Sequence, residues 1–398
     1  MRSFIRRFGG SVTSGGVGFN LELGSNVQLL NLDDHESLYG NRKRLMSVTK
    51  DPRLGNAAKI TSGAGDLRLS GDKEALAVLA GRELQPNRGI PLNLDWIENI
   101  RVNTSAVERR AQTLVTRRTV KKDWQVAWLL RAITCMDLTT LSGDDTDERV
   151  RRLCAKGRQP IRQDLVKLLG IESLNIRVAA ICVYHSFVET AVRALEGSGI
   201  KVAAVSTGFP AGLSPLDERV AEIRRSVETG AHEIDVVITR AHVFGGRWQA
   251  LFDEIATFKA ACGNAHMKVI LGTGDLLTLR NVARASMVAM MAGADFIKTS
   301  TGKEMVNATL PVGLVMTRAI REYAQQTGMA VGFKPAGGIR TAKQSVEWLS
   351  LMKEELGDSW LNAKLFRLGA SSMLADIERQ LEFHATGRYS AEYRHPLA

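Results

Sequence analysis

Cysteine is scarce in this sequence, with only four residues among 398. These four, Cys135, Cys154, Cys182 and Cys262, are far apart and show no CxxC spacing. This pattern argues against a structural zinc site and against the dense framework of a small disulfide-rich protein. The seven histidines are also dispersed, without an HxH or HExxH motif. We therefore expect no metal, no other cofactor and a reducing compartment.

Long hydrophobic runs are absent as well. No stretch of about 18 apolar residues occurs, so we expect no transmembrane helix and no membrane partner. The hydrophobic fraction of 44% and the charged fraction of 24% are those of an ordinary globular protein. A chain of this length is long enough to bury a large core.

Acidic residues are fewer than basic ones, with 42 Asp and Glu against 53 Lys and Arg, which gives a net charge of +11. A nucleic-acid surface is one interpretation, and an enzyme for anionic substrates is the other. The basic residues are interleaved with acids, and no RNA- or DNA-binding signature is present. We therefore expect a small anionic substrate, and not a nucleic acid, as the partner.

The first 21 residues contain Arg2, Arg6 and Arg7 and no acid before Glu22. An organelle transit peptide has this composition, and so does an ordinary disordered tail. The tail is the favoured interpretation, with a cytoplasmic protein expected and an organellar one as the alternative. The glycine-rich stretch 9–18 lacks the GK[ST] ending of a phosphate-binding loop and has the composition of a linker.

Two compositional regimes indicate the domain organisation. Residues 1–86 are rich in Gly, Ser, Asn and charge, which predicts a flexible, low-order N-terminal extension with one short helix at 72–84. Residues 87–398 form the predicted folded domain, which includes N-terminal helices and a C-terminal tail. The role of the extension is not evident from its sequence.

From residue 132 onward, short apolar β-rich runs alternate with longer amphipathic segments. The predicted strands are 132–137, 176–184, 201–207, 233–238, 267–272, 296–300, 330–335 and 365–369, and the predicted helices include 187–197, 215–229, 248–262, 276–291, 313–326 and 342–356. Strand starts recur about every 33 residues, the length of a strand–helix unit. Eight such units predict an α/β protein with a (β/α)8 TIM barrel. An open doubly wound sheet would usually carry a GxGxxG motif after its first strand, and none is present.

Charged residues lie inside four of these apolar runs: Asp137, Asp235, Lys298 and Lys334. An unpaired charge in a barrel interior costs several kcal/mol, so we expect the four to compensate one another around a polar pocket. In a TIM barrel, the carboxyl ends of the strands form the active site.

Two lysines in one buried pocket indicate Schiff-base chemistry. A lysine must be neutral to attack a carbonyl, and both burial and a nearby cation lower its pKa. One lysine would act as the nucleophile and the other as the cation that perturbs it, with Asp235 and a water as general acid and base. The alternative is a set of Lys–Asp salt bridges that only stabilises the barrel.

Small residues follow the last three predicted strands. They are Gly302 and Lys303, Gly337 and Gly338, and Ser371 and Ser372. TIM barrels commonly bind phosphate here through backbone N–H groups, and glycine lets the backbone approach the anion closely. The alternative is that these residues only form tight turns.

The segments that contain these residues resemble the deoxyribose-phosphate aldolases, a family of class I aldolases. The matching stretches are CMDLTTLSGDD, ICVYHSFV, VSTGFPAG, EIDVVI, ADFIKTSTGKEMVNAT, GFKPAGGIRTA and FRLGASS. The resemblance covers about residues 87–393, and NRGIPLNLDWI and RRTVKKDWQVAWLL are similar to the animal-type branch. The pair FIKTSTGK and GFKPAGGIR is the most specific part.

This resemblance implies a TIM barrel that reversibly cleaves 2-deoxy-D-ribose 5-phosphate to D-glyceraldehyde 3-phosphate and acetaldehyde without a metal. It implies that Lys298 forms the Schiff base, that Lys334 is the second active-site lysine and that Asp235 relays protons. Asp137 would contact a substrate hydroxyl. The implied phosphate contacts are Gly302, Lys303, Gly337, Gly338, Ser371 and Ser372, and Thr301 is a further predicted substrate-binding residue. Barrels of this family are often dimers, and the sequence leaves the oligomeric state open.

Three positions qualify the resemblance. Bacterial-type members often carry Glu-Thr-Gly where this chain has Gly272-Thr273-Gly274. Some members end in a mobile tyrosine, a role that Tyr389 or Tyr393 could fill only if the tail folds back. Cys182 matches a pocket cysteine, which we interpret as a packing residue.

Two other functions remain open at this stage. One is another Schiff-base barrel enzyme of transaldolase type. The other is a catalytically silent barrel whose basic N-terminal region binds nucleic acid or a partner. Every expected catalytic position is filled, which favours an active enzyme.

Overall fold

The computed structural model describes residues 84–117 and 120–396. Residues 1–83, which include nearly all of the predicted N-terminal extension and of its predicted helix 72–84, therefore lie outside the described residues. The described chain begins with β1 (Gln85–Pro86), which pairs in parallel with β8 (Met329–Ala330). Asn87 follows, and its side-chain amide donates to the carbonyls of Met290 and Ala294 at 2.9 and 2.8 Å. These bonds attach the start of the described chain to the barrel.

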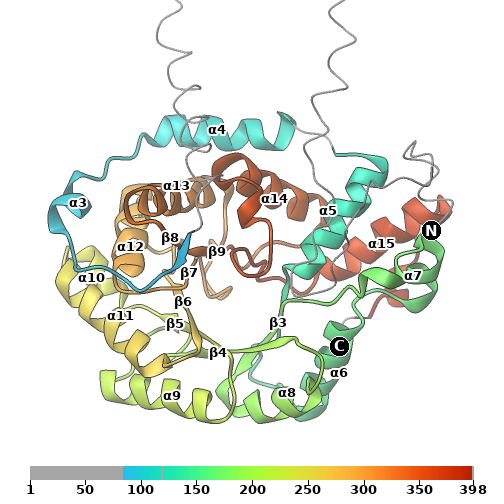
Figure 1. Ribbon diagram of the computed structural model, residues 1–398, viewed down its shortest axis with the longest axis horizontal. Coiled ribbons are helices and arrows are strands. Elements are labelled where there is room, and N and C mark those ends of the chain that lie inside the picture. The colour runs from blue at the N-terminus through green and yellow to red at the C-terminus, as the bar shows by residue number, and fades with distance from the viewer. Residues whose placement is uncertain (1–83, 118–119, 397–398) are drawn as a thin grey trace, which may run out of the picture. The chain divides into compact units, whose positions relative to one another are not determined.

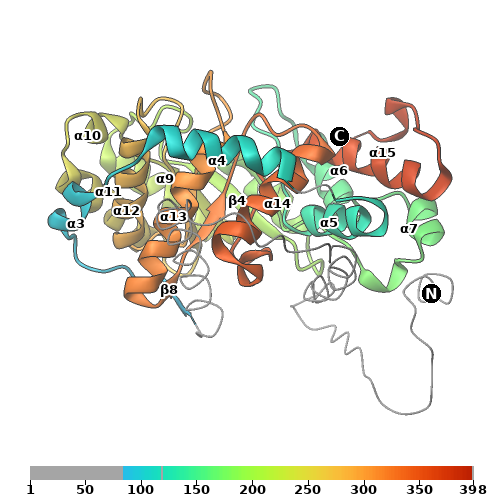
Figure 2. The ribbon, with the colours of Figure 1, turned by 90° about the horizontal axis from the view of Figure 1, so that it is seen from above.

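Three helices precede the barrel strands, as the sequence predicts. They are α3 (Leu94–Asn99), α4 (Thr104–Arg117) and α5 (Lys122–Thr134). Helix α3 is capped by Asn93, whose side chain accepts from the Trp96 N–H at 2.9 Å. Helix α4 lies across α13 and α14, where Figures 1 and 2 show it on the outside of the helical layer.

Seven strands form one parallel sheet in which neighbouring strands follow chain order. They are β2 (Asp137–Thr139), β3 (Ala180–Tyr184), β4 (Lys201–Ser206), β5 (Glu233–Val237), β6 (His266–Ile270), β7 (Phe296–Lys298) and β9 (Gly332–Lys334). Each was anticipated as a strand, but the first prediction, 132–137, was placed too early. Residues 132–134 belong to α5, because a short run that is apolar throughout fits a buried helix as well as a strand.

An eighth segment closes the sheet into a barrel. Phe366 and Gly369 bridge to the β9 side, and Leu368 bridges to Met136 beside β2. The backbone N–H of Arg367 donates to the Phe333 carbonyl at 3.1 Å, and the Asp137 N–H donates to the Leu368 carbonyl at 3.0 Å. The predicted strand 365–369 therefore joins the two sheet edges, and the (β/α)8 prediction is confirmed.

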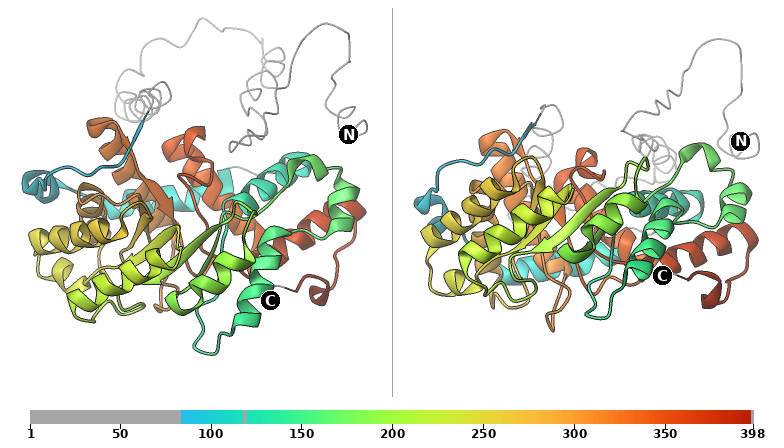
Figure 3. Two further views of the ribbon diagram at one scale, coloured as in Figure 1. Left: turned by 60° about the horizontal axis from the view of Figure 1, so that its bottom comes forward. Right: turned by 90° about the horizontal axis from the view of Figure 1, so that it is seen from below.

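Helices surround the strands, as Figures 1 and 3 show. They are α6 (Asp147–Arg158), α7 (Gln163–Leu169), α8 (Val188–Ala194), α9 (Leu216–Glu228), α10 (Arg240–Phe244), α11 (Trp248–Cys262), α12 (Leu279–Met291), α13 (Leu310–Thr327), α14 (Ala342–Leu356) and α15 (Met373–Thr386). Helices α11 and α14 have the predicted bounds. The sequence patterns had not singled out α6, α7 and α15.

The core lies between the sheet and these helices. Strand side chains such as Ile181, Val236 and Phe333 are fully buried, as are Leu349 of α14 and Ile377 of α15. Burial of apolar surface on both faces of a parallel sheet explains why the strands are almost continuously hydrophobic. Charged residues inside these strands therefore need a specific explanation.

Candidate active site

The four charged residues predicted to share a pocket do so. Asp235 on β5 accepts from Lys298 on β7 at 2.7 Å and from Lys334 on β9 at 2.8 Å. Lys334 also lies 2.5 Å from Asp137 on β2. All four side chains are buried. The carboxylates and the lysines thus face one another across the barrel interior.

Strand register explains this meeting. Lys298 pairs directly with Lys334 between β7 and β9, and Asp235 pairs with Lys268 between β5 and β6. Residues opposite each other in neighbouring strands point to the same face of the sheet. The alternation of side chains therefore directs all of these groups into the barrel.

Three further charged residues that the sequence analysis missed belong to the same network: Lys268, Glu233 and Arg367. Lys268 Nζ lies 2.7 Å from both Asp235 Oδ1 and Glu233 Oε2. Arg367 Nη1 donates to Asp137 at 2.7 Å, and its Nη2 donates to Glu233 at 2.6 Å. The sequence did carry a signal for these three residues, because each is a charged residue inside a predicted apolar strand.

The network contains four cations and three carboxylates. If all were ionised, one positive charge would be left uncompensated in the barrel interior. Lys334, Lys268 and Arg367 each contact two carboxylates within 3.0 Å, whereas Lys298 contacts Asp235 alone. Lys298 is therefore the cation that gains least from keeping its proton.

The pKa directions agree with this charge balance. Burial lowers the pKa of Lys298, and the nearby Lys334 cation lowers it further, against the opposing effect of Asp235. Burial alone would also lower the pKa of Lys334, but Asp137 and Asp235 outweigh it and raise that pKa. The two lysines thus differ in the direction of their shifts.

The carboxylates of the network remain ionised at neutral pH. Burial would raise the pKa of Asp235, but Lys268, Lys298 and Lys334 together hold it well below its usual value. For Asp137, Lys334 and Arg367 likewise outweigh burial and lower the pKa. An ionised Asp235 beside Lys298 can accept a proton, which is the requirement for a general base.

Cys182 lies on β3 within an apolar cluster with Leu141, Ala203 and Val205. Burial raises the pKa of its thiol, so the thiol stays protonated. Cys182 packs in this cluster, and its thiol also lies close enough to Asp235, Lys334 and Lys298 to interact with them electrostatically.

The loops after β7, β9 and the eighth segment meet at one end of the barrel. Thr299 Oγ1 accepts from the Ala336 N–H at 3.0 Å, and the Gly337 N–H donates to the Gly369 carbonyl at 3.3 Å. Gly302, Gly337 and Gly338 have φ angles of 86°, 80° and 79°. A Cβ on Gly302 would lie 4.0 Å from Gly337 Cα, so the two glycines are neighbours.

Ser371 and Ser372 stand at the start of α15, and the two hydroxyls differ. Ser371 Oγ donates to the Thr139 carbonyl at 2.8 Å and accepts from the Thr139 N–H at 2.7 Å. This hydroxyl thus links the eighth segment to β2. Ser372 is exposed, and its side chain makes no capping hydrogen bond. Thr301 and Lys303 lie in the β7 loop beside Gly302, with the Lys303 side chain exposed.

The Gly272-Thr273-Gly274 segment runs beside this loop. The Thr273 N–H donates to the Thr299 carbonyl at 2.9 Å, and the Thr273 hydroxyl is buried without a hydrogen-bond partner. A Cβ on Gly274 would lie 1.9 Å from the Val306 carbonyl oxygen, which no side chain could tolerate. The segment therefore allows the β7 loop to pack closely against the loop after β6.

Both tail tyrosines are exposed in this structure. Tyr389 stacks on Phe383 of α15 with ring centroids 4.3 Å apart, and Tyr393 is 83% exposed. His395 anchors the tail, because its buried ring lies 3.3 Å from Glu382.

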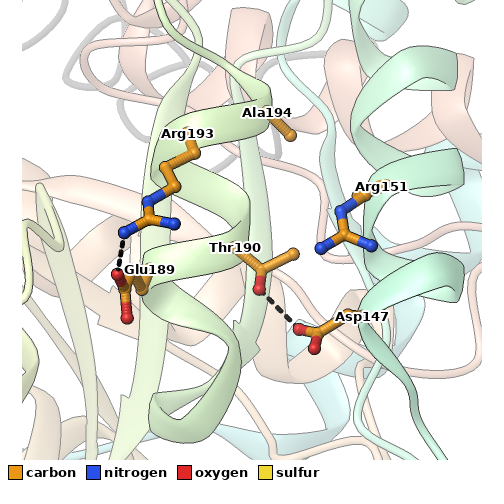
Figure 4. Close-up of a pocket in the computed structure, with 6 residues that line it drawn as sticks. All are labelled: Asp147, Arg151, Glu189, Thr190, Arg193 and Ala194. Carbon is orange, nitrogen blue, oxygen red and sulfur yellow. Dashed lines mark hydrogen bonds and ion pairs between the residues drawn. The ribbon is translucent and has the colours of Figure 1, made fainter.

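A surface hollow of about 420 Å³ lies between α6 and α8. Figure 4 shows its lining residues Asp147, Arg151, Glu189, Thr190, Arg193 and Ala194. Arg193 pairs with Glu189, and Thr190 donates to Asp147, both at 2.5 Å. Its charges are satisfied locally, so the barrel network is the stronger active-site candidate.

No group of three or more His, Cys, Asp or Glu residues in the described part of the chain is arranged to hold a metal ion. None of the described helices is long and apolar enough to cross a membrane.

Comparison with known proteins gives a consistent picture. Residues 131–375 match the family model described as DeoC/LacD family aldolase. A human deoxyribose-phosphate aldolase is 59% identical over 314 residues, which cover 78% of this chain and 99% of the human protein. The mouse deoxyribose-phosphate aldolase is 60% identical over 313 residues, with coverages of 78% and 98%.

The fold has a solved counterpart. A crystal structure of a candidate deoxyribose-phosphate aldolase from Toxoplasma gondii ME49 superposes with a TM-score of 0.57 at 20% identity. The alignment covers 68% of this chain and 98% of that chain. The family match, the close relatives and the buried lysine network together lead to one conclusion: this chain belongs to the DeoC/LacD family and is an aldolase.

Proposed function

We propose that this aldolase cleaves 2-deoxy-D-ribose 5-phosphate reversibly to D-glyceraldehyde 3-phosphate and acetaldehyde through a Schiff base on Lys298, without a metal. The observation that carries the proposal is the lowered pKa of Lys298 within a network whose other cations each contact two carboxylates. A neutral buried amine can attack an aldehyde, whereas the fully paired lysines cannot easily lose their protons.

The reaction begins when Lys298 Nζ attacks the C1 aldehyde of the open-chain sugar. Loss of water gives a protonated imine, which withdraws electrons from the neighbouring carbons. Removal of the proton from the C3 hydroxyl then turns C3 into the aldehyde carbon of the phosphorylated product, and the C2–C3 bond breaks. The electron pair of the C2–C3 bond therefore moves toward the iminium and leaves an enamine of acetaldehyde on Lys298.

 The products agree with this cleavage, because acetaldehyde keeps C1 and C2 while the phosphorylated product keeps C3, C4 and C5.

Protons move through the groups around Lys298. Asp235, which lies 2.7 Å from Lys298 Nζ, is placed to act with a water as general base for the C3 hydroxyl and as general acid for the enamine carbon. Lys334 keeps its charge and holds Asp235 in position at 2.8 Å. Protonation of the enamine at C2 gives an iminium, and its hydrolysis releases acetaldehyde and the free amine.

The phosphate end of the sugar would lie at the loops after β7, β9 and the eighth segment. The positive φ angles of Gly302, Gly337 and Gly338 support this placement, because glycine in this conformation lets the backbone approach an anion. Lys303 would add a positive charge, and Asp137 would contact a substrate hydroxyl. Thr301, Ser371 and Ser372 complete the proposed set through their loop and helix-start positions.

The physiological setting is part of the same proposal. Products and substrate of this kind belong to deoxyribonucleotide catabolism, and we propose a cytoplasmic enzyme. The four cysteines are free and buried, which suits a reducing compartment. The human and mouse relatives are named deoxyribose-phosphate aldolases, which supports the substrate assignment.

Borohydride reduction in the presence of acetaldehyde tests the mechanism. We expect peptide mapping to find an N-ethyl adduct on Lys298 and none in Lys298→Ala, while Lys343→Ala, which changes an exposed lysine, keeps the adduct. An adduct that survives Lys298→Ala would exclude Lys298 as the nucleophile. Failure of acetaldehyde to act as the donor, with a ketose donor accepted instead, would favour a transaldolase-type reaction.

A further inference from the structure

Glu304 folds back onto the loop that follows β7. The Thr301 N–H donates to both carboxylate oxygens of Glu304 at 3.1 and 3.0 Å, and the Gly302 N–H donates to Oε2 at 3.2 Å. The Thr301 hydroxyl donates to Oε2 at 2.7 Å. Three donors of one short loop therefore converge on a single carboxylate, which shows that this loop binds an anion.

These donors belong to the residues that the proposed function assigns to the substrate phosphate. Because one amide N–H cannot serve two anions well, a phosphate and the Glu304 carboxylate compete for Thr301 and Gly302. We propose that Glu304 occupies these donors of Thr301 and Gly302, here called the phosphate cradle, in the free enzyme. The substrate phosphate then binds by displacing the Glu304 carboxylate. This inference rests on the proposed function, since it concerns the same site.

The surroundings of Glu304 allow this exchange. Its neighbours Lys303 and Met305 are exposed, so the displaced carboxylate has solvent to enter. Its backbone carbonyl accepts from Asn307 Nδ2 at 2.9 Å, which holds the main chain of the loop in place. Displacement therefore requires rotation of one side chain and leaves the cradle intact.

The competition weakens the binding of free phosphate and of the phosphosugar alike, but only the phosphosugar has a second anchor. A tethered carboxylate carries one negative charge, whereas a phosphate monoester carries about 1.5 to 2 negative charges and three acceptor oxygens. Free phosphate has only the cradle to hold it, but the phosphosugar is also held by its carbonyl end at Lys298. A cradle that Glu304 already fills lowers its affinity for every other anion by the same factor. Free phosphate, which has no other contact, then binds weakly, while the substrate still binds through its second anchor at Lys298.

Two variants test the proposal: Glu304→Ala, which empties the cradle, and Glu304→Gln, which keeps the shape and removes the charge. Calorimetric titration with inorganic phosphate should give a Kd about tenfold lower for Glu304→Ala than for the wild type, with Glu304→Gln between them. The KM for 2-deoxyribose 5-phosphate should fall in the same order, while kcat/KM for unphosphorylated 2-deoxyribose stays unchanged. Glu228→Ala, which removes an exposed carboxylate at the end of α9, is the control for net charge.

Weaker phosphate binding in both variants, or equal changes for the two sugars, would show that Glu304 only supports the loop and would overturn the proposal. An unchanged Kd and KM would do the same. Failure of the proposed function looks different: the wild type would then not cleave the phosphosugar at all and would form no Lys298 adduct. The two failures are therefore distinguishable.

Discussion

Lys298 and Lys334 are register partners on adjacent parallel strands, and both Nζ atoms lie next to the same oxygen, Asp235 Oδ2, at 2.7 and 2.8 Å. They differ in one contact, because Lys334 also lies 2.5 Å from Asp137. That second carboxylate raises the pKa of Lys334, whereas burial dominates at Lys298 and lowers it. Two equivalent strand positions thus acquire opposite pKa shifts.

Replacing Lys334 by Met should raise the pKa of Lys298, because it removes a nearby cation and leaves Asp235 free to stabilise the Lys298 charge. We expect kcat/KM at neutral pH to fall by about 10² to 10⁴-fold and the pH optimum to move upward. Steady-state kinetics over a range of pH measures both, with Lys343→Met as the exposed control. Wild-type activity and an unshifted pH profile would refute the assigned role of Lys334.

The pH dependence of reductive labelling reports the pKa of Lys298 directly. Because this pKa is lowered, the neutral amine appears at a lower pH than for an ordinary lysine. The labelling rate with acetaldehyde should rise with pH and reach its plateau below about pH 10.4, where free lysine titrates. A rate that continues to rise through that value would mean an unperturbed amine.

Asp235→Asn separates proton transfer from Schiff-base formation. The change leaves four cations and two carboxylates in the network, so the pKa of Lys298 should fall further. We expect kcat to fall by about 10² to 10⁴-fold through loss of the general base, while the reduced adduct on Lys298 still forms. Mass spectrometry beside turnover measurements tests this, with Asp253→Asn on exposed α11 surface as the control. Loss of both turnover and the reduced Lys298 adduct would contradict separate roles of Asp235 in proton transfer and of Lys298 in Schiff-base formation.

Arg367→Leu should destabilise the barrel. Arg367 donates to Asp137 and Glu233, and its removal takes one cation from each of these buried carboxylates, which leaves Asp137 with Lys334 and Glu233 with Lys268 as the nearest cations. Breaking a buried pair in this way costs about 3 to 5 kcal/mol of unfolding free energy. Denaturant unfolding measures the cost, and Arg193→Leu, which removes an exposed pair with Glu189, should change stability much less. Equal effects of the two substitutions would show that the buried network contributes little.

Gly302→Ala tests the phosphate cradle. Gly302 has φ 86°, a conformation that costs an L-residue roughly 1–2 kcal/mol, although space for a methyl group exists. We expect a higher KM for the phosphosugar and little change for 2-deoxyribose. The matched control is Gly328→Ala, which has φ 72° and open space but lies at the end of α13. A KM that rises equally for both sugars would place the effect outside phosphate binding.

Much of the fold was predictable because apolar strands and amphipathic helices repeat with a regular period. The error at residues 132–134 arose where a run is apolar on all sides, since such a run is buried equally well as helix or strand. Lys298, Lys334, Asp235 and Asp137 could be found because a charge inside an apolar strand is costly. Lys268, Glu233 and Arg367 obey the same rule, but only the register shows that they join the others.

The sequence by itself therefore determined the barrel, the strand positions of the charged residues and the glycines that follow them. The tertiary structure decided which of these residues meet, and with that the charge balance of the network. It also revealed that the Glu304 carboxylate accepts hydrogen bonds from Thr301 and Gly302, a contact that no sequence pattern indicates. The physical reason is that a pKa and an ion pair depend on distance and burial, which strand pairing and loop packing fix only in the folded chain.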